Sequence, residues 1–310
     1  MIKCSVLSSG SRANCTYVSN GRSQILIDCG LSLRETERRL RLIGVNPEEI
    51  SAILITHEHR DHVNGVLTFA KKYRVQVFAT MGSLIGAKKF WDDRASYRRA
   101  LKAPEKYFVG EESVSSMFDF RINYLSADDR INWEGFLIEP FSVPHDANEP
   151  VGFRITADKT VLVLATDLGT LTPTIKAYLS SADILILESN HDLDLLFEAP
   201  YPWVLKERIR SDVGHLSNQV VGKFVRELSN SKSCRVKVLI GVHISENSNV
   251  YQLALENLIS AWQGQVNELP EICIAGAEKP TKLFTVSEVE LLTLAECSID
   301  IVPQSVAVGG

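Results

Sequence analysis

Three histidines and an aspartate lie within a stretch of six residues, His57-Glu58-His59-Arg60-Asp61-His62. Imidazole nitrogens and carboxylate oxygens are the ligands that zinc, manganese and iron accept in proteins. The stretch follows an apolar, strand-like run over residues 51–56, and a buried strand that ends in polar residues is a rigid platform for ligands. A polar turn that happens to carry histidines is the alternative, but this density of ligand types favours a metal site.

Residues of the same types follow apolar runs later in the chain. Functional residues gather at one end of the strands when a sheet carries a site, so we expect them to lie close together. Each has a simpler interpretation by itself, such as a turn residue for His145, a helix cap for Asp167 or a core histidine for His243. The five strand-like runs end at or near His57, His145, Asp167, Glu188 and His243.

Residues 8–15, SSGSRANC, form a turn rich in Gly, Ser and Asn. The backbone N–H groups of such a turn can point at an anion, which makes Ser9, Ser11 and Asn14 candidate contacts for the substrate. A plain hairpin is the alternative, and composition alone favours it.

Residues 211–218 lead into a helix that begins near His215. The N-terminus of a helix attracts anions, so a phosphate oxygen could be bound there by His215, Ser217 and Asn218. A capping cluster beside an uninvolved histidine is the alternative. His191, in ESNHDLDLL, could contact a metal ligand or take part in the chemistry directly.

Residues 82–103 form a helical segment in which basic and aromatic side chains alternate. Basic residues can hold a phosphate backbone while aromatic rings stack on bases, and Arg98 and Arg99 are the candidates for this contact. A solvated amphipathic helix with core-facing aromatic rings is the alternative. The side chains concerned are Lys88, Lys89, Arg94, Arg98, Arg99 and Lys102, with Phe90, Trp91 and Tyr97.

Strand-like and helical segments alternate along the chain, and no linker rich in Pro or Gly divides it. We therefore expect one domain over residues 1–286, closed by a hairpin at 271–286. The C-terminal extension, 287–310, is expected to be partly mobile. The other expected strands are 2–8, 24–28, 75–79, 151–157, 160–165, 182–187 and 237–242, and the main helices are 31–43, 63–73 and 82–103.

The composition is that of an ordinary globular protein, with 310 residues, 45% apolar and 23% charged. No run of eighteen apolar residues predicts a membrane span, and the N-terminus lacks the apolar core of a signal peptide. The six cysteines show no C-x-x-C pairing and read as reduced thiols, so we expect a cytoplasmic protein. A net charge of −5 means that any site for a polyanion must be local.

The H-x-H-x-D-H stretch matches the signature of the metallo-β-lactamase-fold hydrolases at every fixed position. From Lys3 to Val286 the chain also resembles the YycJ/WalJ-type nucleases of that fold. The resemblance implies an α/β protein, a four-layer αβ/βα sandwich. Two places depart from the pattern: Arg12-Ala13 before Asn14, and Ser248 before Asn249. The segments that carry the resemblance are SGSRANC, ILIDCGLS, ITHEHRDHVNG, VPHDANEPVGF, ATDLG, ILESNHD, GHLSN and HISENSN.

The resemblance also implies two divalent metal ions, Zn²⁺ or Mn²⁺, and a role for each ligand. The implied ligands of the first metal are His57, His59 and His145. Those of the second are Asp61, His62 and His243, with Asp167 bridging both ions. Asp61 would also orient or deprotonate a water molecule, and His215 would act on the phosphate. Glu188 and His191 are expected to contact ligands.

The implied reaction is phosphodiester hydrolysis of nucleic acid, with DNA favoured over RNA. The enzyme would degrade DNA from a 5′ end, and the family implies a possible role in DNA repair. A hydrolase of small esters, lactones or cyclic phosphodiesters is the alternative enzyme, and an RNA-processing nuclease is the next. A metal-stabilised binding module is the alternative without catalysis. The sequence predicts no membrane contact and leaves any oligomeric partner unknown.

Overall fold

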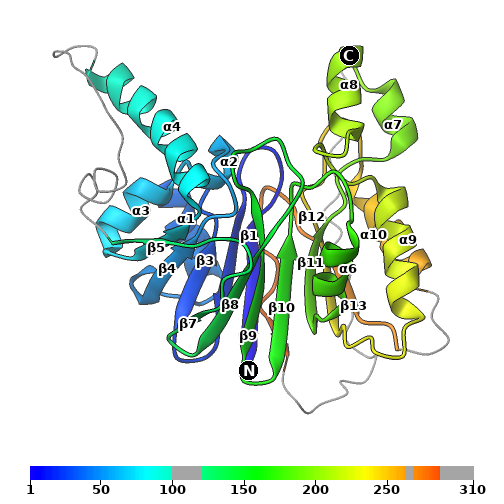
Figure 1. The fold of residues 1–310 in the computed structure, drawn as a ribbon, viewed down its shortest axis with the longest axis horizontal. Helices are drawn as coiled ribbons and strands as arrows, with labels where there is room; N and C mark the ends of the chain where they lie inside the picture. Colours follow the sequence, from blue (N-terminus) through cyan, green and yellow to red (C-terminus); the bar gives the residue numbers. More distant parts are fainter. Residues whose placement is uncertain (100–120, 263–267, 287–310) are drawn as a thin grey trace.

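Two seven-stranded sheets face each other in the residues that this computed structural model describes, which are 1–99, 121–262 and 268–286. Of residues 93–99 only the backbone is described. Helices cover the outer faces of both sheets (Figure 1). No helix in these ranges is long and apolar enough to cross a membrane.

The first sheet is built by the amino-terminal part of the chain and one late strand. Its order is β14-β1-β2-β3-β4-β5-β6, antiparallel from β14 to β3 and parallel from β3 to β6. Its strands are β1 (Ile2–Ser8), β2 (Cys15–Ser19), β3 (Gln24–Ile27), β4 (Ile50–Leu54), β5 (Gln76–Ala79), β6 (Ile122–Tyr124) and β14 (Phe284–Val286). The helices in this part are α1 (Leu33–Leu42), η1 (Pro47–Glu49), α2 (Arg60–Val63), α3 (Val66–Tyr73) and α4 (Met81–Arg99).

The second sheet has the order β13-β12-β11-β10-β9-β8-β7. Strands β10 to β13 are parallel, and β7 to β10 are antiparallel. Its strands are β7 (Ile131–Trp133), β8 (Phe136–Ser142), β9 (Val151–Ala157), β10 (Thr160–Ala165), β11 (Ile184–Glu188), β12 (Val238–Val242) and β13 (Glu271–Ile274). The helices here are α6 (Pro173–Ser180), α7 (Leu193–Glu198), α8 (Trp203–Arg210), α9 (Asn218–Ser229) and α10 (Tyr251–Ala261).

Three separate apolar clusters hold the layers together. The first fills the space between the sheets and includes Val6 and Phe153, both buried. The second packs the first sheet against its helices through Leu40 and Phe69, and the third packs the second sheet against α9 through Phe224. Three cores between four layers are the architecture of an αβ/βα sandwich, so the predicted fold is confirmed.

The predicted hairpin at residues 271–286 is wrong. Strand β13 pairs in parallel with β12 in the second sheet, whereas β14 pairs antiparallel with β1 in the first. The segment between them crosses from one sheet to the other, and Thr281 donates its N–H to the carbonyl of Val6. Gly276 and Pro280 signal turns, but turn residues do not reveal which strand an apolar run will pair with.

Candidate metal centre

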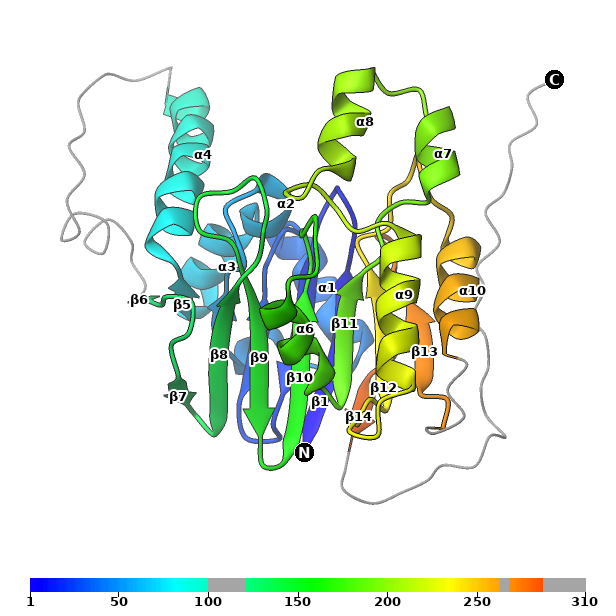
Figure 2. The ribbon, with the colours of Figure 1, turned by 45° about the vertical axis from the view of Figure 1, so that its right-hand side comes forward.

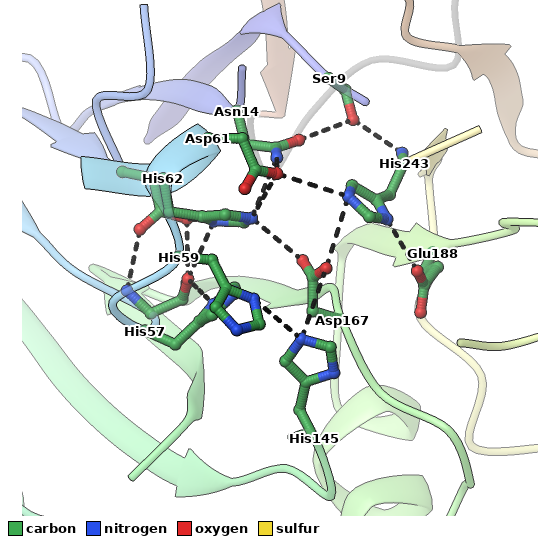
Figure 3. A network of polar contacts seen from close by, with 12 residues as sticks. Ser9, Asn14, His57, His59, Asp61, His62, His145, Asp167, Glu188 and His243 are labelled. Carbon is green, nitrogen blue, oxygen red and sulfur yellow. Dashed lines mark hydrogen bonds and ion pairs between the residues drawn. The ribbon is translucent and has the colours of Figure 1, made fainter. Parts of the chain in front are cut away.

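The seven side chains predicted as metal ligands converge where strands of both sheets end (Figure 3). Their ligand atoms fall into groups within which all atoms lie within 4.8 Å of one another. One group is His57, His59 and His145, and another is Asp61, His62 and His243, which are the two predicted ligand sets. Asp167 belongs to two further groups, one with His57 and His62 and one with Glu188, His215 and His243. Asp167 therefore lies between the two sets.

The loop that carries the signature is fixed by backbone contacts to neighbouring turns. Asn14 donates its N–H to the carbonyl of Asp61, and Cys29 donates to that of His62, both at 2.8 Å. Gly30 donates to the carbonyl of Asn14 and packs so closely that a Cβ atom there would lie 1.5 Å from the oxygen of Asp61. Only glycine fits at this position, and the close packing fixes the ligands of the loop in place.

Three residues at the strand ends have a left-handed backbone. The φ angles are 58° at Asp28, 57° at Asp167 and 57° at His243. Non-glycine residues adopt this conformation rarely, and it persists only where the surrounding structure enforces it. Here it turns the chain sharply at the point where each strand reaches the cluster.

Several buried atoms of the cluster have no hydrogen-bond partner within the described chain. They include His57 Nε2, Asp167 Oδ2 and His243 Nε2. Buried polar atoms in folded proteins are almost always bonded, and each orphaned atom costs free energy. A divalent metal ion accepts both imidazole nitrogen and carboxylate oxygen, so a bound ion would satisfy all three atoms. The donor set therefore fits the metal ions that the sequence predicts.

Asp28 fixes the ring of His62 by a hydrogen bond to its Nδ1. The sequence did not identify Asp28 as a site residue. Its Oδ2 accepts hydrogen bonds from His62 Nδ1 at 2.7 Å and from Thr56 Oγ1 at 2.8 Å, and its Oδ1 accepts from the Thr56 N–H at 2.9 Å. With Nδ1 engaged, Nε2 of His62 is the nitrogen that faces Asp61 and Asp167, at 3.4 and 3.3 Å. Carboxylates of this kind fix the tautomer and orientation of a metal-binding histidine.

Glu188 plays the same part in the second sheet, but for two rings. Its Oε1 accepts from His215 Nδ1 at 2.7 Å and from His243 Nδ1 at 2.9 Å. Its Oε2 accepts from the N–H groups of Leu168 and Leu216. Burial acts to raise the pKa of Glu188, but His215 and His243 outweigh it and hold that pKa at about 2. Its carboxylate therefore holds the rings as a charged acceptor.

The surroundings shift the pKa values of the imidazoles in opposite directions. Burial lowers the pKa of His57 and His145, which favours the neutral ring that can offer a lone pair to a metal. Burial also acts to lower the pKa of His62 and His243, but carboxylates outweigh it and raise both. Asp28 is the strongest of these for His62, and Asp167 for His243.

Two of the three residues predicted to contact substrate from the first turn bond to the cluster itself. Asn14 Nδ2 donates to Asp61 Oδ2 at 3.0 Å, and Ser9 Oγ accepts the N–H of His243 at 2.7 Å. Both side chains are buried. Ser11 is exposed at the tip of the turn, which joins β1 and β2 as an antiparallel hairpin. The geometry gives Ser9 and Asn14 a positioning role, while Ser11 stays available to a substrate.

Comparison with known proteins places the chain in a family. Residues 23–244 match the family model described as the β-lactamase superfamily domain. The chain belongs to the β-lactamase superfamily. With the family shown and the ligand cluster in place, the chain is assigned to its metal-dependent hydrolases.

Members of this superfamily with curated names align with nearly all of the chain. It is 32% identical to the exodeoxyribonuclease WalJ of Streptococcus pneumoniae serotype 2, over 83% of this chain and 87% of that protein. It is 29% identical to the exodeoxyribonuclease YycJ of Bacillus anthracis, over 90% of this chain and 97% of that protein. The fold is similar to that of the metallo-β-lactamase fold protein YhfI from Bacillus subtilis, with a TM-score of 0.61, 17% identity and coverage of 90% and 98%. The resemblance to the YycJ/WalJ-type branch is thereby confirmed.

The positions that depart from the pattern of this branch make local contacts. Arg12 Nε donates to Glu246 Oε1 at 2.7 Å, an exposed contact between the first turn and the loop after His243. Ala13 is buried. Ser248 Oγ donates to Ser245 Oγ at 2.8 Å. The two departures therefore lie in the loops around the cluster, and neither replaces a predicted ligand.

The remaining predicted site residues lie around the cluster or outside the described part. Ser217 caps α9 by accepting the N–H of Val220, and Asn218 is buried with hydrogen bonds to Ser189 and Asn249. His191 is buried, its Nδ1 has no partner among the described residues, and burial lowers its pKa to about 4. The side chains of Arg98 and Arg99, and the extension 287–310, lie outside the described residues.

Proposed function

We propose that this chain is an exodeoxyribonuclease that degrades DNA from a 5′ end with two divalent metal ions, Zn²⁺ or Mn²⁺, and so acts in DNA repair. One observation carries the proposal: a chain that aligns along most of its length with two exodeoxyribonucleases retains a complete cluster of ligand side chains. The number of metals follows from the two ligand groups with Asp167 between them.

We assign to Asp61 the role of acting on the attacking water. Bound divalent ions would lower the pKa of a water molecule and neutralise charge on the phosphoryl oxygens. Burial acts to raise the pKa of Asp61, but His62 and His243 outweigh it and lower that pKa, so the carboxylate is ionised. Its Oδ2 is held by Asn14. An ionised, fixed carboxylate can orient a water molecule or accept its proton.

We assign to His215 the role of acting on the phosphate or on the leaving oxygen. With 18% of its side chain exposed, it is less buried than the neighbouring rings of His145 and His243, which are 2% and 5% exposed. Because Glu188 engages Nδ1, the other ring nitrogen, Nε2, remains for the substrate. A proton donated from Nε2 to the departing oxygen would complete the cleavage of the phosphodiester.

Incubation of metal-reconstituted protein with end-labelled DNA and RNA, single- and double-stranded, tests the proposal. We expect mononucleotides from the 5′-labelled end of DNA to appear first. A 3′-first ladder would correct the polarity alone, and faster cleavage of RNA would assign an RNA-processing nuclease. Hydrolysis of a lactone, thioester or cyclic phosphodiester, with DNA and RNA uncut, would overturn the proposal.

His215→Ala tests the assignment of the acid. It should keep both metals, because its Nδ1 faces Glu188, and lose about 10²–10⁴-fold in kcat. His215→Gln is the matched variant, since an amide can still donate to Glu188 but cannot transfer a proton. Metal loss in both variants, measured by elemental analysis, would make His215 a ligand instead. Full activity in either would remove its catalytic role.

A further inference from the structure

Two of the four exposed aromatic side chains in the described part of the chain lie in the helical pair α7 and α8, between Glu188 and His215 in the sequence. Figures 1 and 2 show both helices rising beyond the sheets at the end that carries α2, the helix of the metal-binding signature. Trp203 is 56% exposed and Phe197 is 45% exposed. Large exposed apolar groups in one place usually mark a contact surface.

Three planar groups lie together on this helical pair. The ring centroids of Phe197 and Trp203 are 6.0 Å apart, and their planes are tilted by 31°. The guanidinium of Arg210 lies over the ring of Phe197, 5.0 Å from its centroid. Trp203 and Arg210 are seven residues apart on α8 and so share one face of the helix. We call Phe197, Trp203 and Arg210 the aromatic platform.

The platform is held by hydrogen bonds between the two helices and from a neighbouring loop. Lys206 is buried and donates from Nζ to the carbonyl of Phe197 at 2.5 Å, which ties α8 to α7. Asn247, in the loop after His243, donates to the hydroxyl of Tyr201 between the two helices. The exposed rings are therefore presented by fixed elements, which lowers the entropy lost when a ligand binds.

The same helix is tied directly to the metal centre. Arg208 Nε donates to Asp146 Oδ2 at 2.6 Å, next to the predicted ligand His145. The carbonyl of Val213 accepts from His145 Nδ1, and His215 donates its N–H to the carbonyl of Ile209. A strand lying on the platform would thus be positioned by the segment that also positions His145 and His215.

We propose that the aromatic platform stacks the bases of a single-stranded segment of the nucleic acid next to the cleaved phosphate. The inference rests on the proposed function, because it assumes a nucleic-acid substrate. Aromatic rings stack on any base, and guanidinium groups both stack and attract phosphate. The guanidinium of Arg210 adds a positive charge beside the two rings, which favours a strand that carries both bases and phosphates.

Binding of single-stranded DNA by Trp203→Ala and Phe197→Ala tests the platform. Each variant should raise Kd by about 5–150-fold, the range for losing one base–aromatic stack. KM should rise by a larger factor than that by which kcat falls. Trp203→Phe should retain most of the affinity. Ile259→Ala, which removes an exposed apolar side chain from α10, is the control and should bind as the wild type does.

A strand with abasic residues in place of its bases makes the test specific. It should bind weakly to the wild type, and Trp203→Ala should weaken it no further, because no base is left to stack. Equal affinity of wild type and Trp203→Ala for normal DNA would overturn the platform while leaving cleavage, and thus the proposed function, intact. The platform would also be overturned if Trp203→Ala changed only the oligomeric state. A wild type that neither binds nor cuts nucleic acid would overturn both proposals.

Discussion

The two sheets supply the metal centre in different ways. The first sheet provides four predicted ligands from one loop, residues 57–62, which follows a single strand. The second sheet provides His145, Asp167 and His243 from the ends of three different strands, β8, β10 and β12. The first half is therefore set by local sequence, whereas the second depends on the order of strands across the sheet.

Each half has one buried carboxylate that orients its histidines. Asp28 at the end of β3 bonds to one ring, that of His62. Glu188 at the end of β11 bonds to two, His215 and His243. In the second half, a single side chain therefore orients two histidines. Replacing Glu188 should disturb more of the site than replacing Asp28.

Asp167→Asn should have the largest effect, because Asp167 lies between the two ligand groups and carries the charge shared by both. We expect at most one metal per chain and a loss of activity beyond the roughly 10–100-fold typical of losing a partner of a ligand. Asp158→Asn is the matched control, since Asp158 also has a left-handed backbone but lies exposed in the turn before β10. Two metals with full activity in Asp167→Asn would show that the halves are independent.

Glu188→Gln should cost more than Asp28→Asn. Loss of a carboxylate that orients a ligand typically costs about 10–100-fold in metal affinity or activity. Asp28→Asn should show this loss in metal affinity alone, whereas Glu188→Gln should lower both metal affinity and kcat, because it also releases His215. Metal titrations and steady-state kinetics on the two variants check the comparison. Equal effects on kcat would mean that His215 does not depend on Glu188.

The same contrast explains what the sequence could predict. The loop at 57–62 carries its chemistry within six residues, so composition and spacing reveal it. The later residues of the cluster could be predicted because each follows an apolar run, and the family resemblance implied a ligand role for each. Asp28 also follows such a run, ILID, and that pattern was the signal that could have identified it. Its pairing with His62 depends on β3 lying beside β4, which no local pattern specifies.

Long-range pairing also explains the error at residues 271–286 and the contacts made by the first turn. The segment 271–286 has the turn residues of a hairpin, yet its strands join different sheets. Ser9 and Asn14 have the composition of an anion-binding turn, but that turn lies against His243 and Asp61 and bonds to them. In both segments the bonding partner is supplied by a distant part of the chain.

His191 provides a smaller test within the second half. Burial lowers the pKa of His191 to about 4, whereas the pKa of a histidine in an unfolded chain is about 6.5. Between these values the unfolded chain binds more protons, so this contribution to stability is present above pH 6.5 and is lost as the pH falls toward 4. His191→Gln should flatten the fall of the urea midpoint over that window. Parallel curves for variant and wild type would show that His191 does not titrate there.

Ser217→Ala should have the smallest effect and separates two roles for the start of α9. The side chain accepts the N–H of Val220 at 3.3 Å, as an N-cap does, and losing such a cap costs about 1 kcal/mol. Thr172→Ala is the matched control, because Thr172 caps α6 in the same way through the N–H of Ile175. We expect both variants to lose similar stability in urea and to keep the KM of the wild type for DNA. A rise in KM for Ser217→Ala alone would make Ser217 a substrate contact, as predicted for an anion-binding helix start. The second sheet would then contact the substrate through the start of α9, whereas the turn of the first sheet supports predicted ligands.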